Sequence, residues 1–192
     1  MDITVHRPGE LTAADRAAWS ALQTATPAAE APRLHNPFLA PEFTLAVGAC
    51  RRDVRISVVR EDGVPTAFFP HQRTPAGVGR AVGLGLSDCQ GLAHGPRFAG
   101  DAAELLRASG LALWEFDHLA AGQPLFEGWA AARFGSPVMD VAEGYDHYLA
   151  GLRDSAHRSS PAPPWPRSAA SNGTTARCGT STTSATRRYC AG

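Results

Sequence analysis

Lysine is absent from this 192-residue chain, so arginine supplies all 18 of its basic side chains. Aspartate and glutamate also number 18 together, and the formal net charge is therefore zero. A protein that binds nucleic acid through the backbone phosphates normally carries an excess of basic groups. The balance of charge therefore argues against a nucleic-acid partner.

Long apolar runs are lacking as well. The opening residues, MDITVHRPGE, contain no apolar stretch of the kind that a secretory signal has. No segment approaches the run of about 18 apolar residues that a membrane span needs. We therefore expect no membrane span and a cytoplasmic location.

Cysteine is scarce, with four residues at Cys50, Cys89, Cys178 and Cys190. None belongs to a CxxC pair, and their spacing matches no zinc-binding template. In a cytoplasmic protein such cysteines are normally reduced. The histidines are scattered and show no metal-ligand spacing, so we expect no metal site.

The composition changes near residue 158. All 18 acidic residues lie between Asp2 and Asp154, and no Leu, Ile, Val, Met or Phe follows Leu152. Residues 159–192 are mostly Ser, Thr, Pro, Ala, Gly and Arg, and such a segment cannot bury enough apolar surface to offset the entropy lost on ordering. We predict a folded domain over 1–158 and a disordered low-complexity tail over 159–192, without packed elements.

The tail has two alternative origins: a natural low-complexity segment, or translation in the wrong reading frame. With third codon bases that are mostly G or C, the frame next to TTARCGTSTTSATRRYC (174–190) can read HGALRYEYDERDAAVLR. That string has the balanced charges and interspersed apolar residues that the tail lacks. We therefore hypothesise that the tail is out of frame.

The pattern along residues 1–158 predicts an α/β (α+β) domain, in which helices flank an antiparallel meander. Thr12 is a suitable N-cap, with Asp15 at the N3 position, for a helix over 13–24. Pro41 opens a second helix. Further helices are predicted over 101–109, over 125–134 after Pro124, and over 145–153.

Alternating apolar residues predict two strands over 54–60 and 64–72, joined by a hairpin turn at Asp62-Gly63. A third antiparallel strand is predicted over 80–86. Additional strands are expected over 2–6, 111–116 and 137–141.

Three short segments have residue types that are suited to chemistry. Arg73–Gly79 (RTPAGVG) is close to a phosphate-binding loop, but its first glycine comes one residue late and a strand follows, so a hairpin is favoured. Ser87–Gly91 (SDCQG) follows an apolar strand and either lines a site or is a plain turn. Cys89 within it is a nucleophile only if a base adjoins it. Asp117-His118 is either an acid–base pair or a surface turn.

Residues 36–43 (NPFLAPEF), 55–73 (RISVVREDGVPTAFFPHQR) and 82–91 (VGLGLSDCQG) occur in an order and spacing that resemble a known family. They resemble the N-terminal half of the bacterial GNAT-type acetyltransferases of the CelD/BcsL type, which are linked to cellulose biosynthesis. Those proteins are similar in turn to the FemABX aminoacyl transferases. The resemblance covers roughly residues 3–155, with Ala40 in place of an expected Ser and Cys89 in place of an aromatic residue.

The resemblance implies a GNAT-like fold half and acyl transfer from acetyl-CoA, or another acyl-CoA, to an amine or hydroxyl of a small-molecule acceptor. It implies that a C-terminal fold holds most of the acyl-CoA. We expect that fold to be missing here, so the truncated chain should be inactive and should not bind acyl-CoA tightly. No catalytic residue of the family maps onto this stretch. The residues implied to line the acceptor cleft are Asn36, Phe38, Glu42, Ser87, Asp88, Gln90 and Gly91.

A domain that normally docks on a second fold should expose apolar surface and self-associate, here through Tyr145, Tyr148 and Leu149. The alternative to an acyltransferase fragment is a non-enzymatic α/β domain that binds a partner or a small ligand. The missing phosphate-binding loop separates these two alternatives, because a chain without it should not bind acetyl-CoA tightly.

Overall fold

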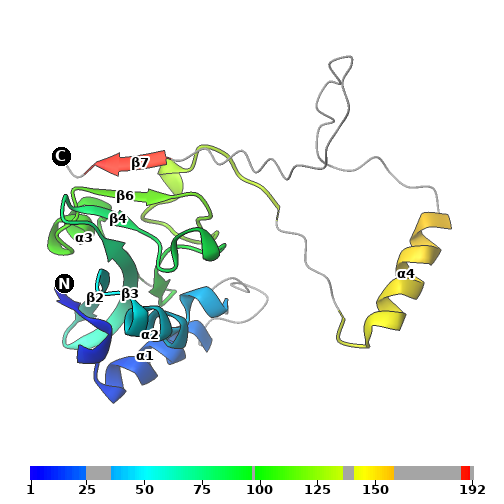
Figure 1. Cartoon of the computed structure of the whole chain (residues 1–192), viewed down its shortest axis with the longest axis horizontal. Coiled ribbons are helices and arrows are strands. Elements are labelled where there is room, and N and C mark those ends of the chain that lie inside the picture. Colours follow the sequence, from blue (N-terminus) through cyan, green and yellow to red (C-terminus); the bar gives the residue numbers. More distant parts are fainter. Residues whose placement is uncertain (25–35, 97, 136–140, 158–186, 191–192) are drawn as a thin grey trace, which may run out of the picture. The chain divides into compact units, whose positions relative to one another are not determined.

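The computed structural model describes residues 1–24, 36–96, 98–135, 141–157 and 187–190. Contacts divide the chain into two compact units, Met1–Ala132 with Ser184–Gly192, and Arg133–Thr183. The first unit is a mixed α/β fold around a mostly antiparallel sheet (Figure 1). The boundary predicted from composition at residue 158 falls at the edge of the described residues and stays a prediction.

The sheet of the first unit follows the order β1-β2-β3-β4-β6-β7, and β5 pairs with β3. Within the described residues β4 and β6 run parallel, whereas the other paired strands run antiparallel. The strands are β1 (Asp2–His6), β2 (Val54–Glu61), β3 (Val64–Arg73), β4 (Val78–Arg80), β5 (Ala93–His94), β6 (Leu113–Phe116) and β7 (Arg187–Cys190).

The β2–β3 hairpin confirms the predicted pairing. The strands are antiparallel, and Glu61 is opposite Val64 at the closing position. Asp62 and Gly63 both have positive φ, +50° and +79°, which is the arrangement of the hairpin turn that matches strand twist. The local turn chemistry therefore sets the position of the longest strand pair.

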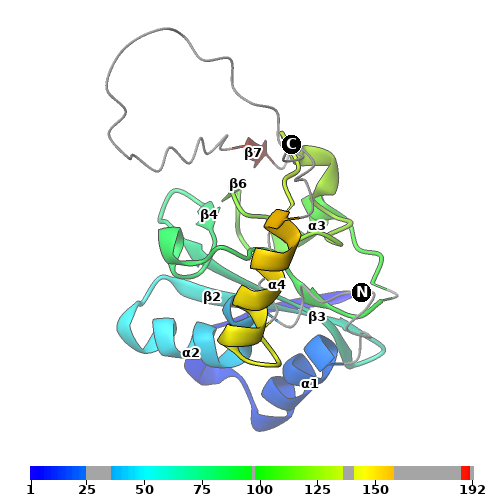
Figure 2. The same cartoon turned by 90° about the vertical axis from the view of Figure 1, so that its right-hand side faces the viewer.

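The helices of the first unit are α1 (Ala13–Thr24), α2 (Pro41–Cys50) and α3 (Ala102–Ala108). Figures 1 and 2 show α1 and α2 on the same side of the strands. The predicted N-cap of α1 is confirmed, because Asp15 N donates to Thr12 Oγ1 at 3.0 Å. The second unit contains α4 (Tyr145–His157), which confirms a helix beginning at Tyr145.

Apolar residues pack on both faces of β2 and β3, since successive side chains point to opposite faces. On the face covered by α1, Trp19 stacks on Phe68 with ring centroids 5.0 Å apart. On the other face Phe69 packs with Trp114 of β6 and with the buried leucines of α3, Leu105 and Leu106. The sheet is therefore the middle layer of the first unit.

The strand predicted over 80–86 is wrong beyond its first residue. β4 ends at Arg80, and Leu84–Leu86 form a 3-10 turn instead. Gly83 and Leu84 both have positive φ, which carries the backbone out of the sheet. Gly83 N donates to Gln72 Oε1 at 2.8 Å, so a side chain from β3 replaces the ladder bond that a strand would make.

The helix predicted over 125–134 is also wrong, because only Glu127–Trp129 are helical, as a 3-10 turn. Phe126 is fully buried and packs on Trp114, with ring centroids 4.5 Å apart. This tertiary contact determines the backbone more strongly than helix propensity does. Most of the strand predicted over 137–141 lies outside the described residues, and Val141 is not in a strand.

The expectation of a tail without packed elements is wrong for Arg187–Cys190. This segment, β7, pairs antiparallel with β6, with Glu115 opposite Arg188 and Leu113 opposite Cys190. Strand addition at a sheet edge uses main-chain groups, so it does not require the apolar side chains that the tail lacks. Residues 158–186 lie outside the description.

Candidate functional site

Two of the three sequence segments that carry the family resemblance, 36–43 and 82–91, meet in space. Leu39, Cys89 and Ala120 form a small apolar cluster, and Phe38 packs against it. Trp19 Nε1 donates to Leu39 O at 2.9 Å and so holds the first segment against α1. The segments 36–43 and 87–91 therefore share this apolar cluster.

Within the first segment, Asn36 and Phe38 have clear structural roles. Asn36 Oδ1 accepts from Phe38 N at 2.9 Å and caps the 3-10 turn Pro37–Leu39. The Phe38 ring packs edge-on against Phe43, with centroids 5.0 Å apart. Asn36 and the exposed Glu42 also line a pocket of about 280 Å³, together with Ser20, Gln23, Thr24, Pro37 and Ala40.

Within the second segment, Ser87 and Gly91 serve the loop itself. The buried Ser87 Oγ donates to Cys89 O at 3.0 Å, while Asp88 is exposed. Gly91 has φ of +138°, and a Cβ there would lie 2.5 Å from the Gln123 side chain. Gly91 therefore leaves room for Gln123, which accepts from Leu92 N at 2.8 Å and donates to Leu92 O at 2.9 Å.

The Cys89 side chain is not suited to nucleophilic attack. It is 7% exposed. Burial, with a smaller contribution from the negative charge of Asp88, raises the pKa of the thiol to about 11. The group is therefore a thiol at neutral pH, whereas the reactive form is the thiolate.

Gln90 ties the loop to the end of β6. Its buried side chain donates through Nε2 to Asp117 Oδ1 at 2.6 Å and to Ser87 O at 3.1 Å. Its Oε1 accepts from Asp117 N at 3.1 Å. The main chain adds a bond from Gln90 N to His118 O at 2.9 Å. Gln90 therefore fixes both the backbone and the carboxylate of Asp117.

A pocket of about 240 Å³ lies where the parallel strands β4 and β6 end. Arg80 and Glu115 are register partners in these strands and form an ion pair at 2.8 Å. In open α/β sheets, ligands bind outside the carboxyl ends of parallel strands. The lining residues are Arg80, Ala81, Leu84, Gly85, Gln90, Glu115, Phe116 and Asp117.

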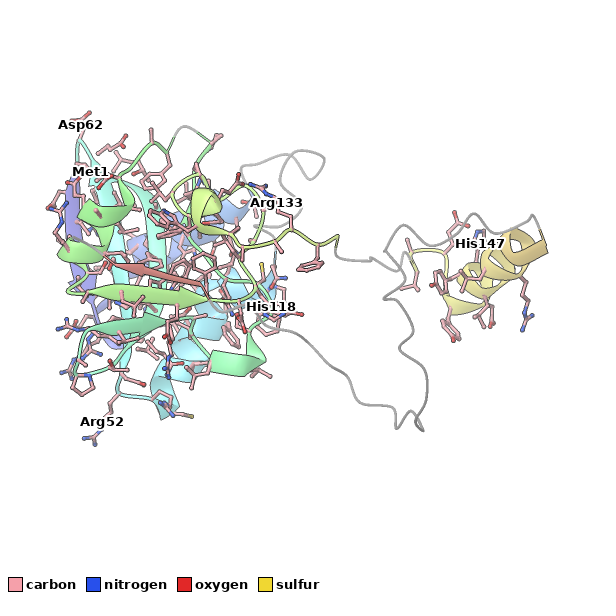
Figure 3. The ribbon with its side chains drawn as sticks, turned by 90° about the horizontal axis from the view of Figure 1, so that it is seen from above. Met1, Arg52, Asp62, His118, Arg133 and His147 are labelled. Carbon is pink, nitrogen blue, oxygen red and sulfur yellow. The ribbon has the colours of Figure 1, made fainter. Side chains whose placement is uncertain are left out.

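Asp117 and His118 interact directly beside this pocket, with His118 Nδ1 3.1 Å from Asp117 Oδ1 (Figure 3 labels His118). Burial by itself raises the pKa of Asp117, but hydrogen bonds from His118 and Gln90 outweigh it, and the net pKa is lowered. A carboxylate only accepts hydrogen bonds, so His118 Nδ1 is the donor. In the neutral ring Nε2 is then an acceptor. The geometry of the Asp117-His118 dipeptide is therefore suitable for an acid–base pair.

The structure separates the residues predicted to line one cleft. Gln90 lines the pocket at β4 and β6, whereas Asn36 and Glu42 line the other pocket. Sequence reasoning missed Arg80 and Glu115 as lining residues. The signal that could have found them is the position of polar residues at the ends of two short apolar strands.

The hairpin interpretation of Arg73–Gly79 is confirmed. Thr74 N donates to Val78 O at 2.9 Å, and Gly77 N donates to Thr74 O at 3.0 Å. The turn joins the antiparallel strands β3 and β4. The N–H groups of Thr74 and Gly77 therefore bond within the turn and are not available to a phosphate.

Comparisons of the chain with protein-family models, with curated proteins and with solved structures found no match. Among the helices that the structure describes, none is long and apolar enough to cross a membrane. The described residues also contain no group of three or more His, Cys, Asp or Glu side chains placed to hold a metal ion.

Proposed function

We propose that residues 3–155 are the N-terminal part of a GNAT-type N-acetyltransferase of the CelD/BcsL type. In this proposal they supply the acceptor side of an acyl transfer from acyl-CoA to an amine or hydroxyl. The observation that carries it is the pocket at the ends of β4 and β6, with the Asp117–His118 pair beside it. The apolar cluster of Leu39, Cys89 and Ala120, which joins two of the three resembling segments, supports it further.

The pair is suited to deprotonating an acceptor. Transfer of an acyl group requires the attacking amine or hydroxyl to lose a proton. Asp117 accepts from His118 Nδ1 and so orients the ring with Nε2 as the basic atom, as the acid of a catalytic triad orients its histidine. His118 is therefore assigned as the base and Asp117 as the residue that positions it.

The described residues do not fit acyl-CoA itself. A pyrophosphate needs backbone N–H groups or cations that point toward it. The Thr74–Val78 turn uses its N–H groups internally, and Arg80 is paired with Glu115. Acyl-CoA is accordingly assigned to a C-terminal fold.

The first test is titration of the full chain with acetyl-CoA by isothermal calorimetry. We expect no binding at micromolar ligand, because the anion-binding groups are used elsewhere. A clear micromolar Kd would contradict the assignment of the cofactor to another fold.

The second test is the nucleotide sequence that follows the Arg158 codon. We propose that the tail is out of frame, so a neighbouring frame should encode an acetyltransferase-like continuation. The protein with the restored frame should transfer an acetyl group to an amine or hydroxyl, and His118→Ala should reduce kcat. The absence of such a continuation in both other frames would show that the frameshift hypothesis is wrong.

A binding module without catalysis is the second candidate. It is favoured by one observation, the internal use of the N–H groups in the Thr74–Val78 turn. The restored-frame protein distinguishes the two, because a binding module would show ligand binding without acyl transfer.

We also propose that the chain self-associates through α4. Tyr145 is 61% exposed and Leu152 47% exposed, while Tyr148 and Leu149 on the same helix are partly exposed. Residues three and four apart share one helix face, so these four side chains form an apolar stripe. Sedimentation velocity should show concentration-dependent association that Tyr145→Ser with Leu149→Ser reduces. A wild-type chain that stays monomeric at all concentrations would contradict this.

A further inference from the structure

We infer that the pocket at the ends of β4 and β6 binds a small organic cation, an ammonium group on a compact apolar body, through the carboxylate of Asp117. The lining that carries this inference is present in the first unit alone. Only the identification of the cation as the acyl acceptor rests on the proposed function.

The charges of the lining favour a cation. Arg80 brings one positive group, and Glu115 and Asp117 bring two negative groups. Arg80 Nε donates to Glu115 Oε2 at 2.8 Å, so these two charges offset each other. The charge left to act on a ligand is that of Asp117. A carboxylate beside apolar walls attracts a cation more strongly than one that is fully surrounded by water.

The Asp117 carboxylate is held in place with one oxygen already used. Gln90 Nε2 and His118 Nδ1 both make their contacts with Oδ1, at 2.6 Å and 3.1 Å. Gln90 is 4% exposed and also accepts from Asp117 N, so the carboxylate is fixed at its backbone and at one oxygen. An ammonium group at Oδ2 would make a charge-assisted hydrogen bond without displacing either existing donor.

The remaining walls are apolar and suit the body of such a ligand. Ala81, Leu84, Gly85 and Phe116 line them. The pocket volume of about 240 Å³ is below the range of drug-sized sites, so the ligand is small.

The test uses the full chain and two probes of nearly equal shape. Cyclohexylamine carries a positive charge at pH 7, whereas cyclohexanol is neutral. We expect isothermal titration to detect cyclohexylamine and to give at least roughly tenfold weaker binding for cyclohexanol. Asp117→Asn keeps the shape and the acceptor for Gln90 but removes the charge, and should weaken cyclohexylamine binding by a similar factor.

Asp62→Asn is the matched control. It removes the same charge from the β2–β3 turn, far from His118 (Figure 3), and should leave binding unchanged. Amide NMR spectra of the wild-type chain provide a measurement that does not depend on a variant folding. Signals of Gln90, Asp117 and His118 should shift on addition of cyclohexylamine, with little change at Asp62.

Three results would overturn the inference: no binding of cyclohexylamine to the folded wild-type chain, equal binding of cyclohexanol, or unchanged binding by a folded Asp117→Asn chain. Acyl transfer by the restored-frame protein is a separate readout. Amine binding without acyl transfer would remove the proposed function and leave this site in place.

Discussion

Two buried glutamines each hold an aspartate, and the two pairs differ in the third group that contacts the carboxylate. Gln72 Nε2 donates to Asp53 Oδ2 at 3.0 Å, and Gln90 Nε2 donates to Asp117 Oδ1 at 2.6 Å. Each glutamine also accepts a backbone N–H through Oε1. The two carboxylates have similar exposure, 35% for Asp53 and 36% for Asp117.

The third group of each pair makes the difference. Arg51 donates to both oxygens of Asp53, from Nε at 3.1 Å and from Nη2 at 2.8 Å. His118 Nδ1 lies 3.1 Å from Oδ1 of Asp117. A fork-shaped guanidinium can bind both oxygens of a carboxylate, whereas an imidazole contributes one N–H to it. The same Gln–Asp unit is therefore combined with a two-oxygen arginine contact at Asp53 and with a single imidazole contact at Asp117.

A glycine accompanies each pair, and replacing these glycines should give the largest effects. A Cβ at Gly91 would lie 2.5 Å from Gln123, which is fully buried and bonded at both ends. A Cβ at Gly83 would lie 2.7 Å from the ring of Phe43, which is partly exposed and has room to shift. We expect Gly91→Ala to lower the free energy of unfolding by about 3 to 5 kcal/mol and Gly83→Ala by about 1 to 2 kcal/mol.

Urea denaturation measures this difference. Gly128→Ala is the control, because nothing lies within 4 Å of its Cβ position and its φ is not positive, so the loss should stay below about 1 kcal/mol. Equal losses at Gly91 and Gly83 would show that the backbone conformation, rather than contact with the neighbouring side chain, determines the loss of unfolding free energy.

Removing the glutamines should have the next largest effect. Gln90→Leu removes the hydrogen bonds that the glutamine makes with Asp117 N, Asp117 Oδ1 and Ser87 O. Gln72→Leu removes the bond with Gly83 N and the bond with Asp53, but Arg51 still holds Asp53. We expect a loss of unfolding free energy of about 2 to 3 kcal/mol for Gln90→Leu and about 1 to 2 kcal/mol for Gln72→Leu. Thermal or urea denaturation checks the order, and the reverse order would contradict the asymmetry between the pairs.

The smallest expected effect concerns acid titration of Asp53. The hydrogen bond from Arg51 is the main cause of its low pKa, burial opposes it, and Gln72 adds to it, so the pKa is about 2 instead of 3.8. A lowered pKa in the folded state stabilises the protein above the unfolded value. That contribution is lost as the pH falls from 3.8 toward about 2.

Arg51→Ala should therefore raise the pKa of Asp53, as measured by carboxyl-carbon NMR, and should flatten the loss of stability in this acidic window. The variant also removes the arginine hydrogen bonds from the Asp53 carboxylate. Cyclohexylamine should still not bind there, because Asp53 lines neither pocket described above. Binding at Asp53 in this variant would show that an open oxygen is sufficient without a pocket.

Local chemistry made part of this fold predictable. The Thr12–Asp15 cap and the Asp62-Gly63 turn each depend on residues within three positions, so sequence identifies them directly. The end of β4 depends on Gln72 bonding Gly83, eleven positions away, and the conformation at Phe126 depends on Trp114. Such contacts between distant residues have no periodic signal.

The candidate site was predictable to the same limited extent. Gln90 belongs to a segment that sequence singled out, but its link to Asp117 spans 27 positions. The Asp117-His118 dipeptide was recognisable as a potential acid–base pair, whereas its place at a pocket follows from the parallel pairing of β4 with β6. That pairing joins strands separated by α3, and no pattern in either strand specifies its partner.

The pairing of β7 with β6 has a consequence for how the gene tolerates damage. A β-ladder is formed by backbone N–H and C=O groups. Every residue except proline carries both of these groups, whatever its side chain. The four residues Arg187–Cys190 occupy the edge of β6 although they come from the segment with the least apolar composition. Because this pairing depends on backbone groups, a change in the downstream reading frame alters the side chains at this edge without removing the groups that pair there, unless it introduces proline. β7 covers the edge of β6 and is itself the outermost strand on this side of the sheet.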